Sequence, residues 1–555
     1  ASSAHALENT SAAPAISPPA SVTAPWPGFA SSFLIARAAE NRGDWQLAEQ
    51  AFASTAARDP YTSEFIHRRS VLLLNQGRFD AASDLAGEME GKGNATHLAH
   101  LLVFAEAARM NDVAAAEAAF NRMSNDGLGQ YLKPFFAAWM ASSFKAAQDA
   151  LRPVSDMPSL SPMVKLHTAL LAERFNETTV ARQNFARLIA EAPSYRAVSL
   201  AAAFYARHNM TERREALLVA ARQAGVEPML VAALRTQPDK ANAVDDLDAG
   251  IAESVFGLAT LLQKEGANDV ALPYLRIVTA LKPDFILAQL MVGDLMLRLG
   301  RYDEAAQIYR AASSSADIGA LATLRLAALQ TQLDGAVQAR ETLQKLVTST
   351  PDWVEAWAQL GDTAMTTGDV HAATGYFSKA IEIAGTGDKE LAARLLFARA
   401  LAYHRLQDMS KAEADLQASI ALMPDDAERL NFLGYLWADR GVRLDEAEQL
   451  VSKAIALQPN SPQIIDTLGW IKYRSGAMDD AVRLLEMAAE LTPYNPVIND
   501  HLGDAYWAAG REREARFQWE RAIAYRASTD STLTSVEDLR RKIAQGIMVR
   551  QAAVR

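Results

Sequence analysis

Cysteine is absent from the 555-residue sequence. The chain therefore has no disulfide, no thiolate metal ligand and no cysteine nucleophile. Long apolar runs are also missing, because no stretch reaches the roughly 18 uncharged apolar residues of a membrane-spanning helix. Basic residues are in the minority, with 55 Lys and Arg against 66 Asp and Glu. The net charge of −11 argues against general nucleic-acid binding, which needs a basic face to neutralise phosphates.

The sequence motifs of the common enzyme classes do not occur either. There is no GxxxxGK[ST] phosphate loop, no GxGxxG after a strand pattern and no GxSxG nucleophile elbow. The nine histidines are scattered and form no close ligand pair such as HExxH. We therefore expect no catalytic residues, no metal site and no cofactor, and a protein that is not an enzyme.

Residues 1–28 differ in composition from the rest of the chain. They hold five prolines among Ala, Ser and Thr, and such a stretch does not form a packed core. We expect a flexible or extended tether here. Ala4-His5-Ala6 has the small-x-small form of a signal-peptidase site, which favours an exported mature protein.

A pattern of small residues returns from Glu253 onward. An alanine that begins a second helix occurs at Ala271, Ala305, Ala339, Ala373, Ala412, Ala447, Ala481 and Ala515, at successive spacings of 34, 34, 34, 39, 35, 34 and 34 residues. A small residue of the preceding helix recurs at Ala259, Gly293, Ala327, Gly361, Ala400, Gly434, Gly469 and Gly503. A turn glycine lies between the two helices at Gly266, Gly300, Gly368, Gly441, Gly476 and Gly510.

Each residue type in this pattern has a physical reason. The small residue of the first helix lets the two helices of a hairpin approach closely. The glycine accepts a positive φ at the helix end and allows a tight turn. A proline follows five of the alanines and marks the exit into the next unit, because proline does not fit a helix interior.

The period and residue types together resemble the tetratricopeptide repeat (TPR) family. The phrases GDLMLRLGRYDEA (Gly293 to Ala305) and GDAYWAAGREREA (Gly503 to Ala515) show the resemblance most clearly. It implies an all-α fold, a right-handed superhelix (α-solenoid) of about 13–14 helical hairpins with a C-terminal capping helix. Function would then lie in protein–protein interaction.

The repeat pattern also divides the chain. Residues 29–228 carry weaker signatures, such as Ala48 with Phe52 and Ala181 with Phe185, and we expect about six hairpins there. The predicted parts are a tether (1–28), a degenerate TPR-like array (29–228), a joint or loop (229–251), a C-terminal TPR array (252–525), and a capping helix with a tail (526–555). The capping helix is expected to begin after Ser535.

The resemblance also implies a partner-binding surface. In this family the first helix of each hairpin lines the concave side, through its second, fifth, ninth and twelfth positions. The candidate contact residues are Asp362, Asn431, Tyr435, Asp466, Trp470, Tyr473, Asp500, Asp504 and Trp507. Exposed aromatic side chains tend to mark contact sites, which favours the cluster of Tyr435, Trp470, Tyr473 and Trp507. The alternative is that a tight superhelix buries these side chains against the adjacent hairpin.

Residues 425–525 have a closer resemblance, carried by Ala438-Asp-Arg-Gly, Asp466-Thr-Leu-Gly-Trp470 and His501-Leu-Gly-Asp504. They are similar to exported TPR proteins of Gram-negative bacteria, including an outer-membrane lipoprotein adaptor that binds a carboxyl-terminal processing protease. The resemblance implies a periplasmic scaffold that brings the protease and its protein substrates together. The lipidated N-terminal cysteine of that class is missing, so either that residue was removed from a position upstream of Ala1 or the lipid anchor is absent.

Two other functions stay open at this point. One is a structural or assembly subunit of a secretion, pilus or polysaccharide-export machine. The other is a regulatory domain for an enzyme on another chain. In neither of these two functions is nucleic acid expected as a partner.

Overall fold

The computed structural model describes residues 28–57, 63–93, 95–123, 125, 127–236, 244–315, 318–333, 335–385, 387–526 and 535–547. Within these ranges the regular structure is helical throughout, and no strand occurs. The predicted all-α fold is confirmed. The predicted tether lies outside the described residues except for Gly28, which precedes the first helix.

The chain divides into two compact units, Ala1–Ala322 and Thr323–Arg555, which we describe separately. The sequence predicted a joint earlier, at 229–251. Part of that stretch lies outside the described residues, and the division expected there stays a prediction.

The described residues of the first unit form seventeen α-helices and the start of an eighteenth. They are α1 (Phe29–Asn41), α2 (Trp45–Ala56), α3 (Ser63–Asn75), α4 (Phe79–Gly91), α5 (His97–Arg109), α6 (Val113–Arg122), α7 (Gly129–Met140), α8 (Phe144–Ser155), α9 (Ser161–Arg174), α10 (Thr178–Glu191), α11 (Tyr195–Arg207), α12 (Thr211–Gln223), α13 (Pro228–Thr236), α14 (Leu247–Lys264), α15 (Asn268–Leu281), α16 (Ile286–Arg298), α17 (Tyr302–Ala312) and α18 (Gly319–Gln332).

The second unit begins within α18 and continues to the last described helix. Its helices are α19 (Ala336–Ser349), α20 (Val354–Thr366), α21 (Val370–Ala384), α22 (Lys389–Arg405), α23 (Met409–Leu422), α24 (Ala427–Arg440), α25 (Leu444–Leu457), α26 (Pro462–Ser475), α27 (Met478–Leu491), α28 (Pro496–Ala508), α29 (Glu512–Arg526) and α30 (Val536–Gln545).

Consecutive helices pack as hairpins: six from α1 to α12, two from α14 to α17 and five from α20 to α29. We call the first helix of each hairpin its A helix and the second its B helix. The number of hairpins agrees with the sequence prediction. The capping helix is also confirmed as α30, which begins after Ser535, where the Ser535 hydroxyl accepts a hydrogen bond from the Asp538 amide at 2.9 Å.

The small residues of the repeat do what the sequence predicted. A Cβ added at Gly503 would lie 2.4 Å from the Trp519 ring, and one at Gly361 would lie 2.5 Å from the Phe377 ring. Each of these rings belongs to the B helix of the same hairpin. The glycine is therefore what allows a large aromatic side chain to fill the hairpin interior, because real Cβ atoms do not approach other atoms so closely.

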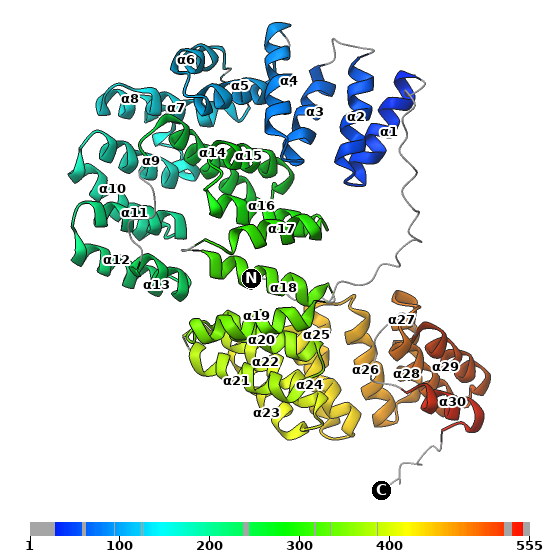
Figure 1. The fold of residues 1–555 in the computed structure, drawn as a ribbon. Helices are drawn as coiled ribbons and strands as arrows, with labels where there is room; N and C mark the ends of the chain where they lie inside the picture. Colours follow the sequence, from blue (N-terminus) through cyan, green and yellow to red (C-terminus); the bar gives the residue numbers. More distant parts are fainter. Residues whose placement is uncertain are drawn as a thin grey trace. The chain divides into compact units, whose positions relative to one another are not determined.

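The first unit has a feature that the repeat pattern did not predict. Helices α14–α17 run along the inner side of the row formed by α1–α13 (Figure 1). Helix α14 packs against the A helices α5, α7 and α9, and α15 packs against α3, α4 and α5. The chain's own helices thus cover the A-helix face of the first unit.

Helix α14 makes a close and charged contact with this face. Gly250 lies directly on the Trp139 ring, and a Cβ added there would be 2.1 Å from a ring atom. Glu253 is 2% exposed and accepts a hydrogen bond from the Arg196 Nε at 2.9 Å. A buried carboxylate needs such a partner, so the pair aligns α14 on α11.

The following helices continue the contact toward the chain's beginning. Arg276 of α15 donates a hydrogen bond from Nη2 to the Asn75 carbonyl at 3.1 Å. Arg301, just before α17, donates from Nη1 to the Gly43 carbonyl at 3.1 Å. Its guanidinium also lies 4.1 Å from the centre of the Trp45 ring, a distance typical of a cation–π contact. These bonds join the first hairpins to helices more than 200 residues later.

Candidate partner-binding surface

The nine predicted contact residues lie on the A helices of the second unit. Asp362 is on α20, Asn431 and Tyr435 are on α24, Asp466, Trp470 and Tyr473 are on α26, and Asp500, Asp504 and Trp507 are on α28. They fall into two groups. One group is buried between successive A helices, and the other is partly or fully exposed.

Trp470 belongs to the buried group. Its ring stacks on two others, with centroid distances of 4.2 Å to His501 and 4.8 Å to Tyr473. His501 comes from α28, the A helix of the next hairpin. For Trp470 the structure therefore shows the packing that the alternative interpretation described. Its role in partner binding stays a prediction.

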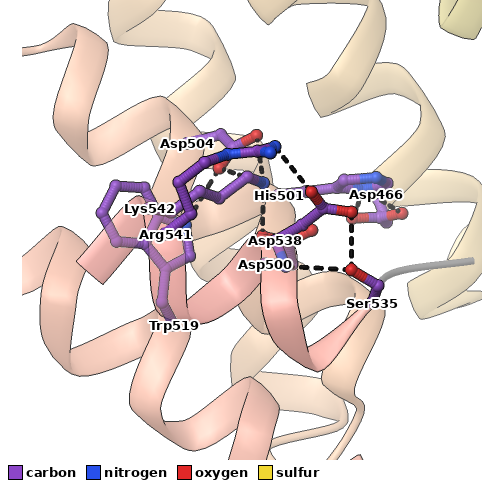
Figure 2. A network of polar contacts seen from close by, with 9 residues as sticks. All are labelled: Asp466, Asp500, His501, Asp504, Trp519, Ser535, Asp538, Arg541 and Lys542. Carbon is purple, nitrogen blue, oxygen red and sulfur yellow. Dashed lines mark hydrogen bonds and ion pairs between the residues drawn. The ribbon is translucent and has the colours of Figure 1, made fainter. Parts of the chain in front are cut away.

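Asp466 is buried beside the same histidine. His501 Nδ1 lies 3.0 Å from both carboxylate oxygens of Asp466 (Figure 2). Burial alone would lower the pKa of His501, but the Asp466 carboxylate, with smaller contributions from Asp500 and Asp504, outweighs burial and raises it. The contact is thus a charge-assisted bond between α26 and α28 when His501 is protonated.

Asp500 and Asp504 are one helical turn apart on α28 and are 5% and 6% exposed. Lys542 of α30 places its Nζ 2.6 Å from Asp500 and 2.7 Å from Asp504, as Figure 2 shows. Trp519 Nε1 also donates to Asp504, at 2.9 Å. Burial and the neighbouring Asp500 raise the pKa of Asp504 to about 6, although Lys542 acts in the opposite direction.

Trp507 is covered by the segment after α30. Its Nε1 donates a hydrogen bond to the Ile547 carbonyl at 3.0 Å. Gly546 crosses the ring with φ near +70°, and a Cβ added there would lie 1.8 Å from Trp507. Only glycine fits this position, because of both the positive φ and the close approach.

The sequence prediction missed Lys542 and Gly546, although both lie in the predicted capping helix or directly after it. The sequence contains part of the information needed to predict the role of Lys542. A lysine on an otherwise apolar-periodic helix face is a candidate partner for buried carboxylates. The number of residues between α29 and α30 does not follow the repeat, so the pairing with Asp500 could not be assigned from spacing.

Partly exposed rings gather on α22 and α24, and the predicted Tyr435 is one of them. Phe397, His404, Phe432 and Tyr435 form a row of partly exposed rings, which we call the aromatic row. Phe432 is in its middle, with centroids 6.0 Å from Phe397, 5.3 Å from His404 and 6.4 Å from Tyr435. Burial, and to a smaller extent Asp439, raises the pKa of Tyr435.

Two further polar groups lie on this face. Asn431 Oδ1 is buried and has no hydrogen-bond partner within the described ranges. An unpaired buried acceptor is costly, so a ligand that donates a hydrogen bond there would be favoured. Asp362 on α20 is exposed at its surface, but desolvation by the atoms packed around its carboxyl raises its pKa to about 6, opposed by the charge of Arg394.

Comparison with known proteins identifies the repeat. A family model described as tetratricopeptide repeat matches residues 256–318, 360–427 and 397–462. The chain contains tetratricopeptide repeats.

A TPR repeat-containing protein of Pseudomonas aeruginosa is 31% identical over 195 residues, which are 35% of this chain and 27% of that protein. The match thus spans about a quarter of the relative's length. Among solved structures, a TPR protein from Parabacteroides merdae is 14% identical with a TM-score of 0.38, over 46% of this chain and 96% of that one. YrrB, described as a TPR protein with an unusual peptide-binding site, is 15% identical with a TM-score of 0.27, over 34% of this chain and 94% of that one.

Two further features are absent from the described part of the chain. No group of three or more His, Asp or Glu there is arranged to hold a metal ion. No helix there combines the length and hydropathy needed to cross a bilayer.

Proposed function

We propose that this chain is a non-catalytic scaffold that binds another protein through the A-helix face of its second unit. TPR repeats support protein–protein interaction in general. The observation that carries the more specific proposal is the aromatic row on α22 and α24, four neighbouring rings that are left partly exposed. Aromatic side chains dominate the binding energy of protein interfaces, and water-exposed rings in a row are otherwise unfavourable.

The unpaired Asn431 Oδ1 supports the same surface. It lies on α24, one turn before Tyr435, and it would accept a hydrogen bond from a backbone amide or a polar side chain of the partner. The apolar rings and a nearby acceptor are the combination expected of a site that binds a peptide segment.

We further propose that the chain works as a periplasmic adaptor that holds a carboxyl-terminal processing protease and its protein substrates together. This proposal is based on the resemblance of residues 425–525 to exported adaptor lipoproteins. Such a scaffold would act by raising the effective concentration of substrate at the protease. The proposed location is the periplasm, with a tether to the outer membrane.

The test is affinity capture from an envelope extract with three forms of the full chain. They are the wild type, a double variant His404→Ala with Tyr435→Ala, and a control variant Phe517→Ala. Phe517 is 56% exposed on α29, away from the aromatic row. We expect the wild type and the control to recover a protease. The double variant should recover at least about fivefold less of that protease than the wild type.

Circular dichroism of all three forms establishes that the helices are intact. Equal recovery by the double variant would contradict the aromatic row as the binding surface. Recovery of a membrane channel in place of a protease would contradict the adaptor proposal and favour an assembly subunit.

A further inference from the structure

Helix α30 takes the place of a next A helix. We call the contact from one A helix to the next a step of the array. In the step before α30, Asp466 of α26 pairs with His501 of α28. Asp500 lies 34 residues after Asp466, at the equivalent position of α28, and it pairs with Lys542 of α30. An acidic residue of one A helix thus meets a basic residue of the following helix in both steps. Helix α30 also packs on the B helix α29, as α28 packs on the B helix α27.

The two steps differ in what holds the following helix. Helix α28 forms a hairpin with α29, whereas α30 is a single helix of ten residues in the part of the chain that the structure describes. Isolated helices shorter than about 12–15 residues are marginal in water. Leu539 is the one residue of α30 that is fully buried. Helix α30 is therefore held by the surface on which it lies.

That surface selects a particular kind of helix. Its acidic pair, Asp500 and Asp504, is buried and requires a cation, which Lys542 supplies. Covering the end of a solenoid needs only an apolar face, and buried ion pairs add little stability compared with apolar packing. What a buried pair adds is discrimination, because a helix without the lysine would leave two carboxylates unneutralised.

The residues of α30 that meet this surface form a short pattern. Leu539 fills the apolar contact, Lys542 and Ile543 follow one turn later, and Gly546 allows the backbone to cross Trp507. Arg541 is exposed and pairs with Asp538 of the same helix. A helix from another protein with the same inward pattern would meet the same groups.

We propose that the surface formed by α28 and α29 is a docking site for a lysine-bearing amphipathic helix, and that α30 is its exchangeable resident. The partner is a protein helix with an apolar residue, a lysine three residues later, a second apolar residue and a glycine after one more turn. The argument for this occupant is charge complementarity to Asp500 and Asp504. The proposal adds a second contact to the scaffold role proposed above, distinct from the aromatic row.

The experiment uses a fluorescent peptide of residues 535–547 and the full chain. Leu539→Asp in the chain places a charge in the buried contact and weakens the resident helix. We expect the peptide to bind the Leu539→Asp chain at least about tenfold more tightly than the wild-type chain, whose site is occupied. A control peptide with Lys542→Glu should bind the same variant at least about tenfold more weakly, because it adds a third negative charge to the acidic pair.

Four results would overturn the proposal. They are no peptide binding to a Leu539→Asp chain that keeps its helical signal, equal binding of the two peptides, a loss of helical signal larger than ten residues, and a wild-type dimer in light scattering. A loss of helical signal larger than ten residues would mean that α30 is needed for the fold of its neighbours. A wild-type dimer would mean that the helix bound at this site comes from a second copy of the chain. Peptide binding does not involve the aromatic row, so this test and the capture experiment can fail separately.

Discussion

The A-helix faces of the two units differ in what covers them. In the first unit, α14 and α15 pack across α3, α5, α7 and α9, so that the chain occupies its own inner face. In the second unit, the described contacts of α22 and α24 are mainly with neighbours in the array, and the aromatic row stays partly exposed. The repeat signature is stronger in the helices that do the covering than in the helices that they cover. A repeat signature thus predicts a hairpin. Whether the A-helix face of that hairpin is exposed depends on whether helices from later in the chain pack on it.

The largest expected effect is the difference in stability loss between a buried and a partly exposed aromatic side chain of the second unit. Trp470→Ala removes a buried ring that stacks on both His501 and Tyr473, and we expect it to lower the free energy of unfolding by about 3–5 kcal/mol. Tyr435→Ala, on the partly exposed aromatic row, should cost about 1 kcal/mol or less. Urea unfolding of both variants measures the difference. Equal costs would show that the two side chains are equally buried.

The second prediction concerns the covered face of the first unit. Gly250→Ala places a methyl group against the Trp139 ring, and we expect a loss of about 1–3 kcal/mol as α14 is pushed from α7. Gly87→Ala is the matched control, because a Cβ there meets no atom within 4 Å. That substitution should be neutral or slightly stabilising, since alanine favours a helix interior. Limited proteolysis near α14 should increase for Gly250→Ala only.

The third prediction is a pH dependence at the end of the second unit. The raised pKa of His501 stabilises the fold below its unfolded value of 6.5, and this contribution is lost as the pH rises through the folded pKa. The pKa of Asp504, raised from 3.8 to about 6, also makes the folded state less favourable as the pH rises through that range. Both groups make the terminal hairpins more stable at pH 5.5 than at pH 7.5, by about 1 kcal/mol.

Urea unfolding followed by tryptophan fluorescence at the two pH values measures this difference. Asp504→Asn removes one of the two titrating groups and should reduce the pH dependence without abolishing it. A wild-type chain that is more stable at pH 7.5 would contradict the assignment of these charges.

The smallest expected effect is at the exposed carboxylate of the second unit. Asp362→Asn should raise the free energy of unfolding at pH 7 by less than about 1 kcal/mol, because desolvation raises the pKa of this carboxyl while its exposure on α20 allows water to screen the charge. Thermal unfolding checks this. A larger effect would indicate that the A-helix face is more enclosed at α20 than the exposure of this side chain suggests.

The sequence predicted those parts of the fold that repeat locally. Gly361 and Gly503 contact an aromatic side chain on the B helix of their own hairpin. Both residues of each contact therefore lie within one 34-residue repeat, where the pattern predicts them. The packing of α14 on α7 could not be predicted in this way. Gly250 and Trp139 lie in different hairpins, and neither position has a counterpart at the repeat spacing.

The sequence predicted which helices carry the candidate residues, but not how far each residue is exposed. All nine residues lie on A helices of the second unit, as expected from their repeat positions. Trp470 and Asp466 are buried because the next A helix brings His501 against both of them. A general rule for groove positions does not contain this information, because burial depends on the particular side chain that the following hairpin supplies.

The most direct test of the contrast between the two faces uses the absence of cysteine. Met163→Cys places a thiol on the A helix α9, where Met163 contacts Gly257 of α14, and Tyr435→Cys places one on the aromatic row. Each variant is reacted with a water-soluble maleimide under native conditions. We predict that the thiol at position 435 reacts at least about tenfold faster than the one at position 163, which is accessible only after local opening. Equal rates, or a faster reaction at position 163, would contradict the conclusion that the A-helix face of the first unit is covered by α14 and α15 whereas the aromatic row of the second unit is partly exposed.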